Sequence, residues 1–239
     1  MKLIMPMAGD GTRFADAGYT QPKPLIPING VPMFAHAERC IELDFDERIF
    51  IVRKEHDINS RVLEWYPDAT VIELDYLTEG TACTLLTARE HYEDGSSIFV
   101  ANCDQHIEWD SYHAQEIMDT PGVDGLIPNF HCPGRSPKWS YAMVDDRQNI
   151  KRVAEKDPIS EWATVGYYYW RDGQQFIQSV DMMMSANDRV NNEFYTCPVY
   201  NHTLKIPGIG NIKHIEVDVM KGIGTPEDVE RFCFYYKRR

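Results

Sequence analysis

Residues 2–14 read KLIMPMAGDGTRF, a short apolar run followed by a turn that contains two glycines. The run Lys2–Met7 is predicted to be a buried strand because it is short and apolar. Gly9 and Gly11 allow the backbone after the strand to turn tightly and to point N–H groups at an anion. Arg13 and the nearby Lys23 add positive charge. The segment therefore indicates a strand that leads into a phosphate-binding loop.

A plain strand-to-helix turn with two solvated cations would give the same pattern, and a lone G-x-G does not exclude it. Two better-known phosphate loops are excluded. No Gly-Lys-Ser/Thr occurs in the chain, so the loop is not a Walker loop. Phe14 stands where the third glycine of a dinucleotide fingerprint belongs.

Outward from the loop, short apolar runs alternate with helical periodicity. Strands are predicted at 49–53, 70–75 and 97–101, and helices at 33–43, 57–65 and 81–91. Such alternation predicts an α/β fold, a Rossmann-like αβα sandwich around a central mixed, mostly parallel sheet. Ligands of such sheets bind beyond the carboxyl ends of the strands, which here means after Met7, Asp75 and Ala101.

The second half of the chain is less regular. Strands are predicted at 124–128, 141–144, 150–154 and 164–170, as a mixed extension of the same sheet. A last helix is predicted to open at Thr225, with Pro226 in its first turn. Because no linker interrupts residues 1–239, we expect a single domain, with a nucleotide-binding half over about 1–120 and an acceptor-binding half over about 121–239.

The composition limits the class of protein. With 43% apolar and 26% charged residues, the 239-residue chain is typical of globular proteins. Its 24 basic and 37 acidic residues give a net charge of −13, which argues against a general nucleic-acid binder. No run approaches the roughly 20 apolar residues of a membrane helix, and the six cysteines are scattered. We therefore expect no membrane partner, reduced thiols and a cytoplasmic location.

Gly9-Asp10-Gly11-Thr12-Arg13 followed by Pro22-Lys23 closely resembles the G-x-G-T-R…P-K signature of sugar-phosphate nucleotidylyltransferases. It is most similar to the branch found in bacterial capsule and surface-polysaccharide clusters. Further matches follow in order along nearly the whole chain: Glu79–Ala82, Asn102–Gln105, Val153–Lys156, Thr164–Gly166, Asn192–Phe194 and Gly224–Pro226. Each match is weak, but six in register are specific. The resemblance implies a nucleotidyltransferase fold of the type shared with GT-A glycosyltransferases.

The resemblance also implies roles for residues of the first half. Arg13 and Lys23 are implied as catalytic cations. The nucleoside triphosphate is implied to lie against Ala8, Gly9, Gly11, Thr12, Gly80, Thr81 and Asp104.

Asp104 is the implied ligand of Mg²⁺, whose hard charge takes oxygen ligands. The family commonly has a second aspartate directly before x-Gly-Thr near the C-terminus, but Gly222 stands there in this chain. Asp218 is the candidate substitute, and Mg²⁺ otherwise relies on Asp104, phosphates and water. His106, just past Asp104, is either close to the phosphate or metal, or simply exposed.

Asp75 occupies the spacing at which the family often has a base-reading glutamine. An ionised carboxylate only accepts hydrogen bonds, so it suits the amino group of cytosine or the N–H pair of guanine better than O4 of uracil or thymine. The spacing therefore gives a hypothesis of CTP over UTP.

For the acceptor, Lys156 resembles the family lysine that neutralises the acceptor phosphate, with Glu155 beside it. Glu193 resembles an acid that binds sugar hydroxyls, and Gly166 a position where backbone lies against the acceptor. Trp139 and Tyr141 are candidates for stacking on a sugar, although alternate aromatics in a strand usually belong to the core. His131 and Cys132 are adjacent and form a poor pair of zinc ligands, and no zinc site is predicted.

The function implied is transfer of a nucleotidyl group from a nucleoside triphosphate to a sugar 1-phosphate or similar small phosphate ester, with release of pyrophosphate. Two alternatives remain: a GT-A-type glycosyltransferase that uses a nucleotide sugar, and a noncatalytic nucleotide-sugar-binding module. A D-x-D motif of the first alternative would need an acid at Asn102. The sequence leaves the nucleobase and the acceptor open. Relatives often assemble, so a homo-oligomer is also implied, with the aromatic segment 232–236 as either an interface or core packing.

Overall fold

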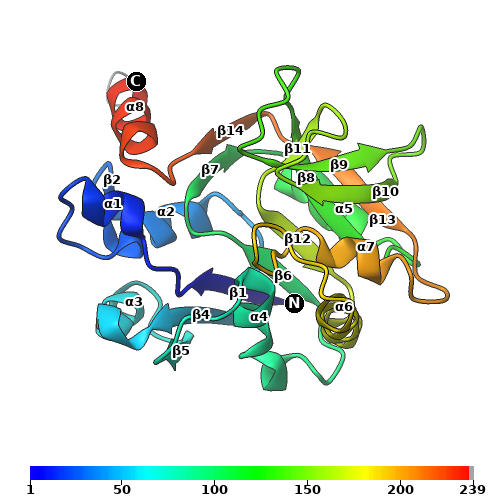
Figure 1. Ribbon diagram of the computed structural model, residues 1–239, viewed down its shortest axis with the longest axis horizontal. Helices are drawn as coiled ribbons and strands as arrows, with labels where there is room; N and C mark the ends of the chain where they lie inside the picture. The colour runs from blue at the N-terminus through cyan, green and yellow to red at the C-terminus, as the bar shows by residue number, and fades with distance from the viewer. Residues whose placement is uncertain (237–239) are drawn as a thin grey trace.

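The computed structural model describes residues 1–236, and its centre is a ten-stranded sheet (Figure 1). The strands of this sheet are β1 (Lys2–Met7), β4 (Glu47–Arg53), β5 (Thr70–Leu74), β6 (Ile98–Ala101), β8 (Gly125–His131), β9 (Ser140–Val144), β10 (Ile150–Glu155), β11 (Trp162–Thr164), β12 (Tyr167–Trp170) and β13 (Ile212–Glu216). Their order is β10–β9–β11–β8–β12–β6–β1–β4–β5, and β13 pairs with β8. One sheet therefore runs through both halves of the chain.

The sheet is mixed, as predicted. Strands β4, β1 and β6 pair in parallel with β1 at the centre, β5 extends this block beside β4, and β13 lies parallel to β8. Strands β10, β11 and β12 run against the remaining strands. The antiparallel pairs thus lie in the second half, where the sequence showed fewer helices between its strands.

The helices cover both faces of the sheet. They are α1 (Thr12–Asp16), α2 (Met33–Arg39), α3 (Asn59–Trp65), α4 (Thr81–Leu86), α5 (Ser111–Asp119), α6 (Gly173–Ser185), α7 (Val199–Thr203) and α8 (Pro226–Tyr236). Successive side chains of a strand point to opposite faces. Accordingly, Leu3 and Met5 of β1 pack with α2, α3 and α5, whereas Ile4 packs with α4, α6 and α7.

A third, smaller core lies beside the glycine loop. It joins Phe14 of α1 and Met33 of α2 to Val229 and Phe232 of α8. Segments from both ends of the chain therefore pack together, as Figure 1 shows at its upper left. Phe232 is buried and Phe234 and Tyr235 are exposed, so the core interpretation holds for only part of the last aromatic segment.

One strand prediction needs correction. The predicted strand 164–170 is two strands, β11 and β12, because the chain turns at Gly166 with a φ of +82°. The second half was expected to have fewer helices between its strands, and none lies between β8 and β12; α6, the longest helix among the described residues, follows β12. A small ribbon outside the main sheet, β7 (Gln105–Glu108) with β14 (Val219–Gly222), was not predicted because its residues lack a clear alternation.

The order of the strands places the ligand crevice. From β1 the chain moves outward through β4 to β5 and then returns to β6 on the other side of β1. Parallel sheets bind ligands where the strand order reverses in this way, outside the carboxyl ends of the strands. The segments that follow β1, β5 and β6 therefore meet at one site.

Candidate active site

Two adjoining cavities occupy this crevice and meet at Thr81. The first, here the loop cavity, has a volume of about 430 Å³ and is lined by residues after β1 and β5 and by the segment around Glu193. The second, here the Asp104 cavity, measures about 230 Å³ and is lined by residues after β6 and by second-half residues that include Glu155 and Gly166. Each space therefore holds predicted residues of both the nucleotide side and the acceptor side, such as Asp104 with Glu155 and Thr81 with Glu193.

Lys23 and the buried Phe14 fix the position of the glycine loop. Gly11 adopts a left-handed φ of +64°, and a Cβ there would lie 3.3 Å from Cβ of Lys23. Phe14, buried in the third core, anchors the turn that follows, while Thr12 and Arg13 stay exposed. Ala8 and Gly9 line the loop cavity, and Arg13 lines the Asp104 cavity. The loop therefore borders both spaces.

Lys23 and Asp104 form an ion pair at the centre of the site. Nζ of Lys23 lies 2.6 Å from Oδ2 of Asp104, and about a quarter of each side chain is exposed. Burial opposes both charges, but the partner outweighs it, so the pKa of Lys23 is raised and the pKa of Asp104 is lowered. Arg13 also lowers the pKa of Asp104. Both groups of the pair are therefore charged near neutral pH.

Asp104 is fixed by the segment that precedes α8. The backbone N–H of Ile223 donates to the carbonyl oxygen of Asp104 at 2.9 Å. A Cβ on Gly224 would lie 2.6 Å from Oδ2 of Asp104, so the carboxylate occupies the space that a larger residue would need. The Gly224-Thr225 match of the sequence analysis therefore has a steric role beside Asp104.

Gly80 joins the two halves of the site. The carbonyl of Glu79 accepts from the N–H of Phe194 at 2.8 Å, and the N–H of Ala82 donates to the carbonyl of Phe194 at 2.9 Å. Gly80 has a φ of +132°, and a Cβ there would lie 2.4 Å from the carbonyl oxygen of Phe194. Only glycine allows this approach, which brings Thr81 and Glu193 to the same cavity.

The predicted acceptor residues converge in part. Gly166 and Glu155 line the Asp104 cavity. The Ser140 hydroxyl donates to Glu155, whose pKa is raised because burial outweighs this bond and the nearby Lys156. Gly166 lies against Asn102 and Gln105, since its Cβ would come within 2.5 Å of Nδ2 of Asn102. Asn102, Gln105 and Ser140 line the cavity together with Glu155 and Gly166.

Lys156 and Glu193 lie at the edges of the site. Nζ of Lys156 donates to the Tyr195 hydroxyl at 2.7 Å and lies 4.5 Å from the centre of that ring. Tyr195 lines the Asp104 cavity, whereas Lys156 does not. Glu193 lines the loop cavity instead of the Asp104 cavity. The structure therefore separates two residues that the sequence placed on one acceptor.

Asp75 and Asp218 are not brought into the cavities. Asp75 is exposed directly after β5, and the loop cavity is lined by Leu77, Thr78 and Glu79 instead. Asp218 is exposed at the far end of β14, five residues from Ile223, which is roughly 16 Å along a strand. Asp218 is therefore wrong as a second ligand of an ion at Asp104, because β14 runs away from it.

A lysine lies where the second acid was expected. A Cβ on Gly222 would lie 3.0 Å from the Trp139 ring and 3.6 Å from Nζ of Lys138. Nζ of Lys138 also pairs with Asp228 of α8 at 2.7 Å. Lys138 and Trp139 line the Asp104 cavity, so the place of an acid next to a metal is taken by a cation and a ring.

Among the candidate ligands of Mg²⁺, the protein supplies one carboxylate, that of Asp104. Asp104 binds Lys23 through Oδ2, which leaves its other oxygen for an ion. Gln105 adds a buried Oε1 that has no hydrogen-bond partner among the described residues, on the wall of the same cavity. Mg²⁺ is usually held by one or two carboxylates together with substrate phosphates and waters. The residues present are compatible with that arrangement.

Sequence reasoning missed Lys138, Tyr195 and Arg189. Arg189 lines the loop cavity, pairs with Glu79 and lies 3.9 Å from the centre of the Phe194 ring. All three come from irregular segments of the second half, where no periodicity assigns a face. Trp139 was named as a stacking candidate and lines the Asp104 cavity, whereas Tyr141 is fully buried core.

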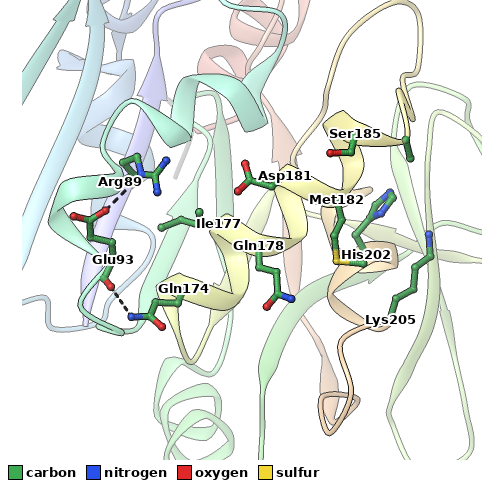
Figure 2. Close-up of a pocket in the computed structure, with 11 residues that line it drawn as sticks. Arg89, Glu93, Gln174, Ile177, Gln178, Asp181, Met182, Ser185, His202 and Lys205 are labelled. Atoms are coloured by element: carbon green, nitrogen blue, oxygen red, sulfur yellow. Dashed lines mark hydrogen bonds and ion pairs between the residues drawn. The ribbon is translucent and has the colours of Figure 1, made fainter.

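A larger cavity lies elsewhere on the described surface. Figure 2 shows this groove of about 990 Å³, formed by the Arg89–Glu93 turn, one side of α6 and the end of α7. Gln174 donates to the Glu93 carbonyl at 2.7 Å within it. It contains none of the residues singled out from the sequence, so its size does not make it the reaction site.

A known protein family matches the first half of this chain in sequence. The family model described as the MobA-like NTP transferase domain matches residues 4–115, which include the glycine loop, Lys23, Gly80 and Asp104. The bifunctional protein GlmU of Methanococcus maripaludis is 29% identical over 135 residues, covering 53% of this chain and 32% of GlmU. The mannose-1-phosphate guanylyltransferase catalytic subunit beta of Dictyostelium discoideum is 30% identical over 164 residues, covering 66% of this chain and 46% of that protein. The chain thus spans between about a third and a half of these two relatives.

A solved structure matches over nearly the full chain. The nucleoside-diphosphate-sugar pyrophosphorylase of Vibrio cholerae superposes with a TM-score of 0.79 at 24% identity, covering 97% of this chain and 99% of that one. A likeness at this identity establishes the fold, and it confirms the α/β architecture expected from the sequence.

Proposed function

We propose that this chain is a nucleotidyltransferase that couples a nucleoside triphosphate to a sugar 1-phosphate or a similar small phosphate ester. The observation that carries the proposal is the Lys23–Asp104 ion pair, whose carboxylate lines the Asp104 cavity together with Arg13. A triphosphate needs concentrated positive charge, and this site supplies it within a protein of net charge −13. The names of the matched relatives support the same class of reaction.

In the proposed reaction, an oxygen of the acceptor phosphate attacks the α-phosphorus. The new P–O bond forms as the bond from the α-phosphorus to the bridging oxygen breaks, and the electron pair leaves with pyrophosphate. The acceptor is already ionised near neutral pH, so no general base is required. Arg13 and Lys23 orient the triphosphate and offset the charge that develops on it.

We assign Mg²⁺ to Asp104 and the substrate phosphates. When bound, this ion would neutralise charge on the phosphate oxygens. Lys138 provides a further, protein-borne cation on the lining of the Asp104 cavity, beside Gly222. We propose that Lys138 leaves Asp228 to meet the acceptor phosphate, so that the site works with one metal-binding carboxylate.

We retain CTP over UTP as the proposed nucleotide preference and move the base-reading carboxylate from Asp75 to Glu79. Glu79 lines the loop cavity, where Arg189 holds its carboxylate. An ionised carboxylate accepts from the amino group of cytosine and has no donor for O4 of uracil.

The further assignments follow the resemblance. We place the product among the activated precursors of capsule or other surface polysaccharides and the enzyme in the cytoplasm. All six cysteines are free, which supports a reducing compartment. No described helix has both the length and the apolar character that a bilayer crossing requires. The exposed Phe234 and Tyr235 on α8 are the proposed contact of a homo-oligomer.

The test follows pyrophosphate release with Mg²⁺, four triphosphates (CTP, UTP, dTTP and GTP), and a panel of sugar 1-phosphates and other phosphate esters. Release that requires both substrates supports the proposal. Cleavage of nucleotide sugars without consumption of triphosphate would identify a glycosyltransferase. Binding of nucleotide sugars with neither reaction would identify a noncatalytic module.

A further inference from the structure

Two histidines and a cysteine lie close together between α2 and β7, the strand that pairs with β14. His36 and Cys40 are four residues apart at the end of α2, which places them on the same side of the helix, and His106 comes from β7. Nδ1 of His106 lies 3.2 Å from Nε2 of His36 and 3.3 Å from Sγ of Cys40. The three ligand atoms all lie within 4.8 Å of one another.

We propose that His36, Cys40 and His106 bind a borderline transition-metal ion of the zinc class. Two imidazoles and a thiolate are the donors that zinc prefers over magnesium. Ligand atoms around a tetrahedral zinc ion, with Zn–N near 2.0–2.1 Å and Zn–S near 2.3 Å, stand about 3.3–3.6 Å apart. The two measured separations are close to this range, so an ion fits with little movement of the side chains.

Neighbouring groups orient the ligands. Nε2 of His106 lies 3.4 Å from Oε1 of Glu108, so a proton on Nε2 directs the lone pair of Nδ1 toward His36 and Cys40. The Cys40 thiol donates to the carbonyl oxygen of His36 at 3.2 Å, and binding of an ion would displace this proton. A carboxylate behind the ligating histidine is typical of zinc sites.

The location gives the ion a structural role. The neighbours of His106 along the chain are Gln105, which lines the Asp104 cavity, and Ile107, which is buried. The Phe232 ring of α8 lies 4.9 Å from the His106 ring and 5.4 Å from the His36 ring, centre to centre. A bound ion would therefore connect β7 to α2 next to α8. It would stabilise the β7–β14 ribbon, which begins beside Asp104. This inference does not depend on the proposed function.

The test is a titration of metal-stripped protein with Co²⁺ and then Zn²⁺, without substrates. We expect one Co²⁺ per chain, with a thiolate-to-cobalt absorption band that Zn²⁺ removes, and a higher melting temperature with Zn²⁺. Cys40→Ser should abolish the band, whereas Cys83→Ser, at a half-buried cysteine of α4, should keep it. Glu108→Gln should weaken binding by about 10–100-fold.

A second measurement uses the unaltered protein, in case a variant fails to fold. Zn²⁺ should protect Cys40 from iodoacetamide, as read by peptide mapping, and leave the labelling of Cys83 unchanged. Absence of stoichiometric binding at micromolar metal, or a band that survives in folded Cys40→Ser, would show a cluster held by hydrogen bonds only and would overturn the proposal.

Discussion

The ammonium of Lys23 lies 2.6 Å from the carboxylate of Asp104, although 81 residues separate them. Lys23 begins a 3-10 turn after the glycine loop, and Asp104 follows β6. Their ion pair connects the segment between β1 and α2 to the segment that follows β6. Removing either charge should therefore affect stability as well as chemistry, which distinguishes this pair from the exposed Arg13.

Arg13→Ala and Lys23→Ala should differ in stability and agree in activity. Each should lower kcat by on the order of 10²–10³-fold, because a cation opposite the triphosphate is lost. Lys23→Ala should also cost about 1–3 kcal/mol of unfolding free energy, because Asp104 loses its partner in a partly buried place. Pyrophosphate release and urea unfolding measure the two effects. Arg61→Ala, in an exposed ion pair of α3, is the matched control. Normal turnover in both variants would show that neither cation takes part in the reaction.

Lys138→Gln should raise KM for the phosphorylated acceptor by roughly tenfold or more, because a charge-assisted contact to phosphate is lost. KM for the triphosphate should change little, since Lys138 lines the Asp104 cavity and not the loop cavity. Steady-state kinetics with each substrate varied in turn provide the measurement. Lys221→Gln, on the neighbouring β14, serves as the control. An unchanged KM for the acceptor would leave Lys138 as a partner of Asp228 only.

Gly80→Ala should destabilise the fold by roughly 2–4 kcal/mol, since its Cβ would overlap the Phe194 carbonyl at a positive φ. Gly134→Ala is the control, because no atom lies within 4 Å of its added Cβ. Thermal and urea unfolding compare the two variants. Equal stabilities would mean that the Phe194 segment moves aside without cost and that its close approach to residue 80 does not require glycine.

Glu79→Gln should reduce the ratio of kcat/KM for CTP to that for UTP, because an amide can donate to O4 of uracil where the carboxylate cannot. Asp75→Asn should leave this ratio unchanged, since Asp75 lies outside the lining of the loop cavity. Competition assays with both triphosphates measure the ratio directly. A shift with Asp75→Asn alone would restore the sequence-based assignment.

Stability should fall in mild acid through His214. Burial lowers the pKa of this side chain to about 4, and its Nδ1 lies 3.0 Å from Oδ1 of Asn129. Between pH 6.5 and 4 the unfolded chain binds a proton at His214 and the folded chain does not, so unfolding is favoured as pH falls. The loss should reach on the order of 3 kcal/mol near pH 4. His214→Gln should flatten this part of the profile in urea unfolding, whereas His113→Gln, exposed on α5, should not. Parallel profiles for His214→Gln and the unaltered protein would contradict the assignment.

The first half of the fold was predictable because its signals are local. Lys2–Met7 was predicted as a strand with its observed bounds, and the strand predicted at 70–75 is β5, Thr70–Leu74. The loop after β1 and Asp104 after β6 meet in the structure because parallel strands end at one edge. The zinc-class ligands escaped the sequence analysis, although the His36-x₃-Cys40 spacing was visible, because their partner His106 lies 66 residues beyond Cys40.

Most of the residue types proposed for the chemistry of the candidate site could be identified from the sequence. Which side chains line its cavities depends on long-range packing. Alternating apolar runs, the two glycines and the cations Arg13 and Lys23 are properties of short segments, so the sequence alone was enough to predict a phosphate site after the first strand. Which side chains reach the cavities depends on contacts between distant segments: β14 carries Asp218 away from Asp104, and Trp139 with Lys138 fills the space beside Gly222. Such contacts follow from how the whole chain packs, and no local periodicity encodes them.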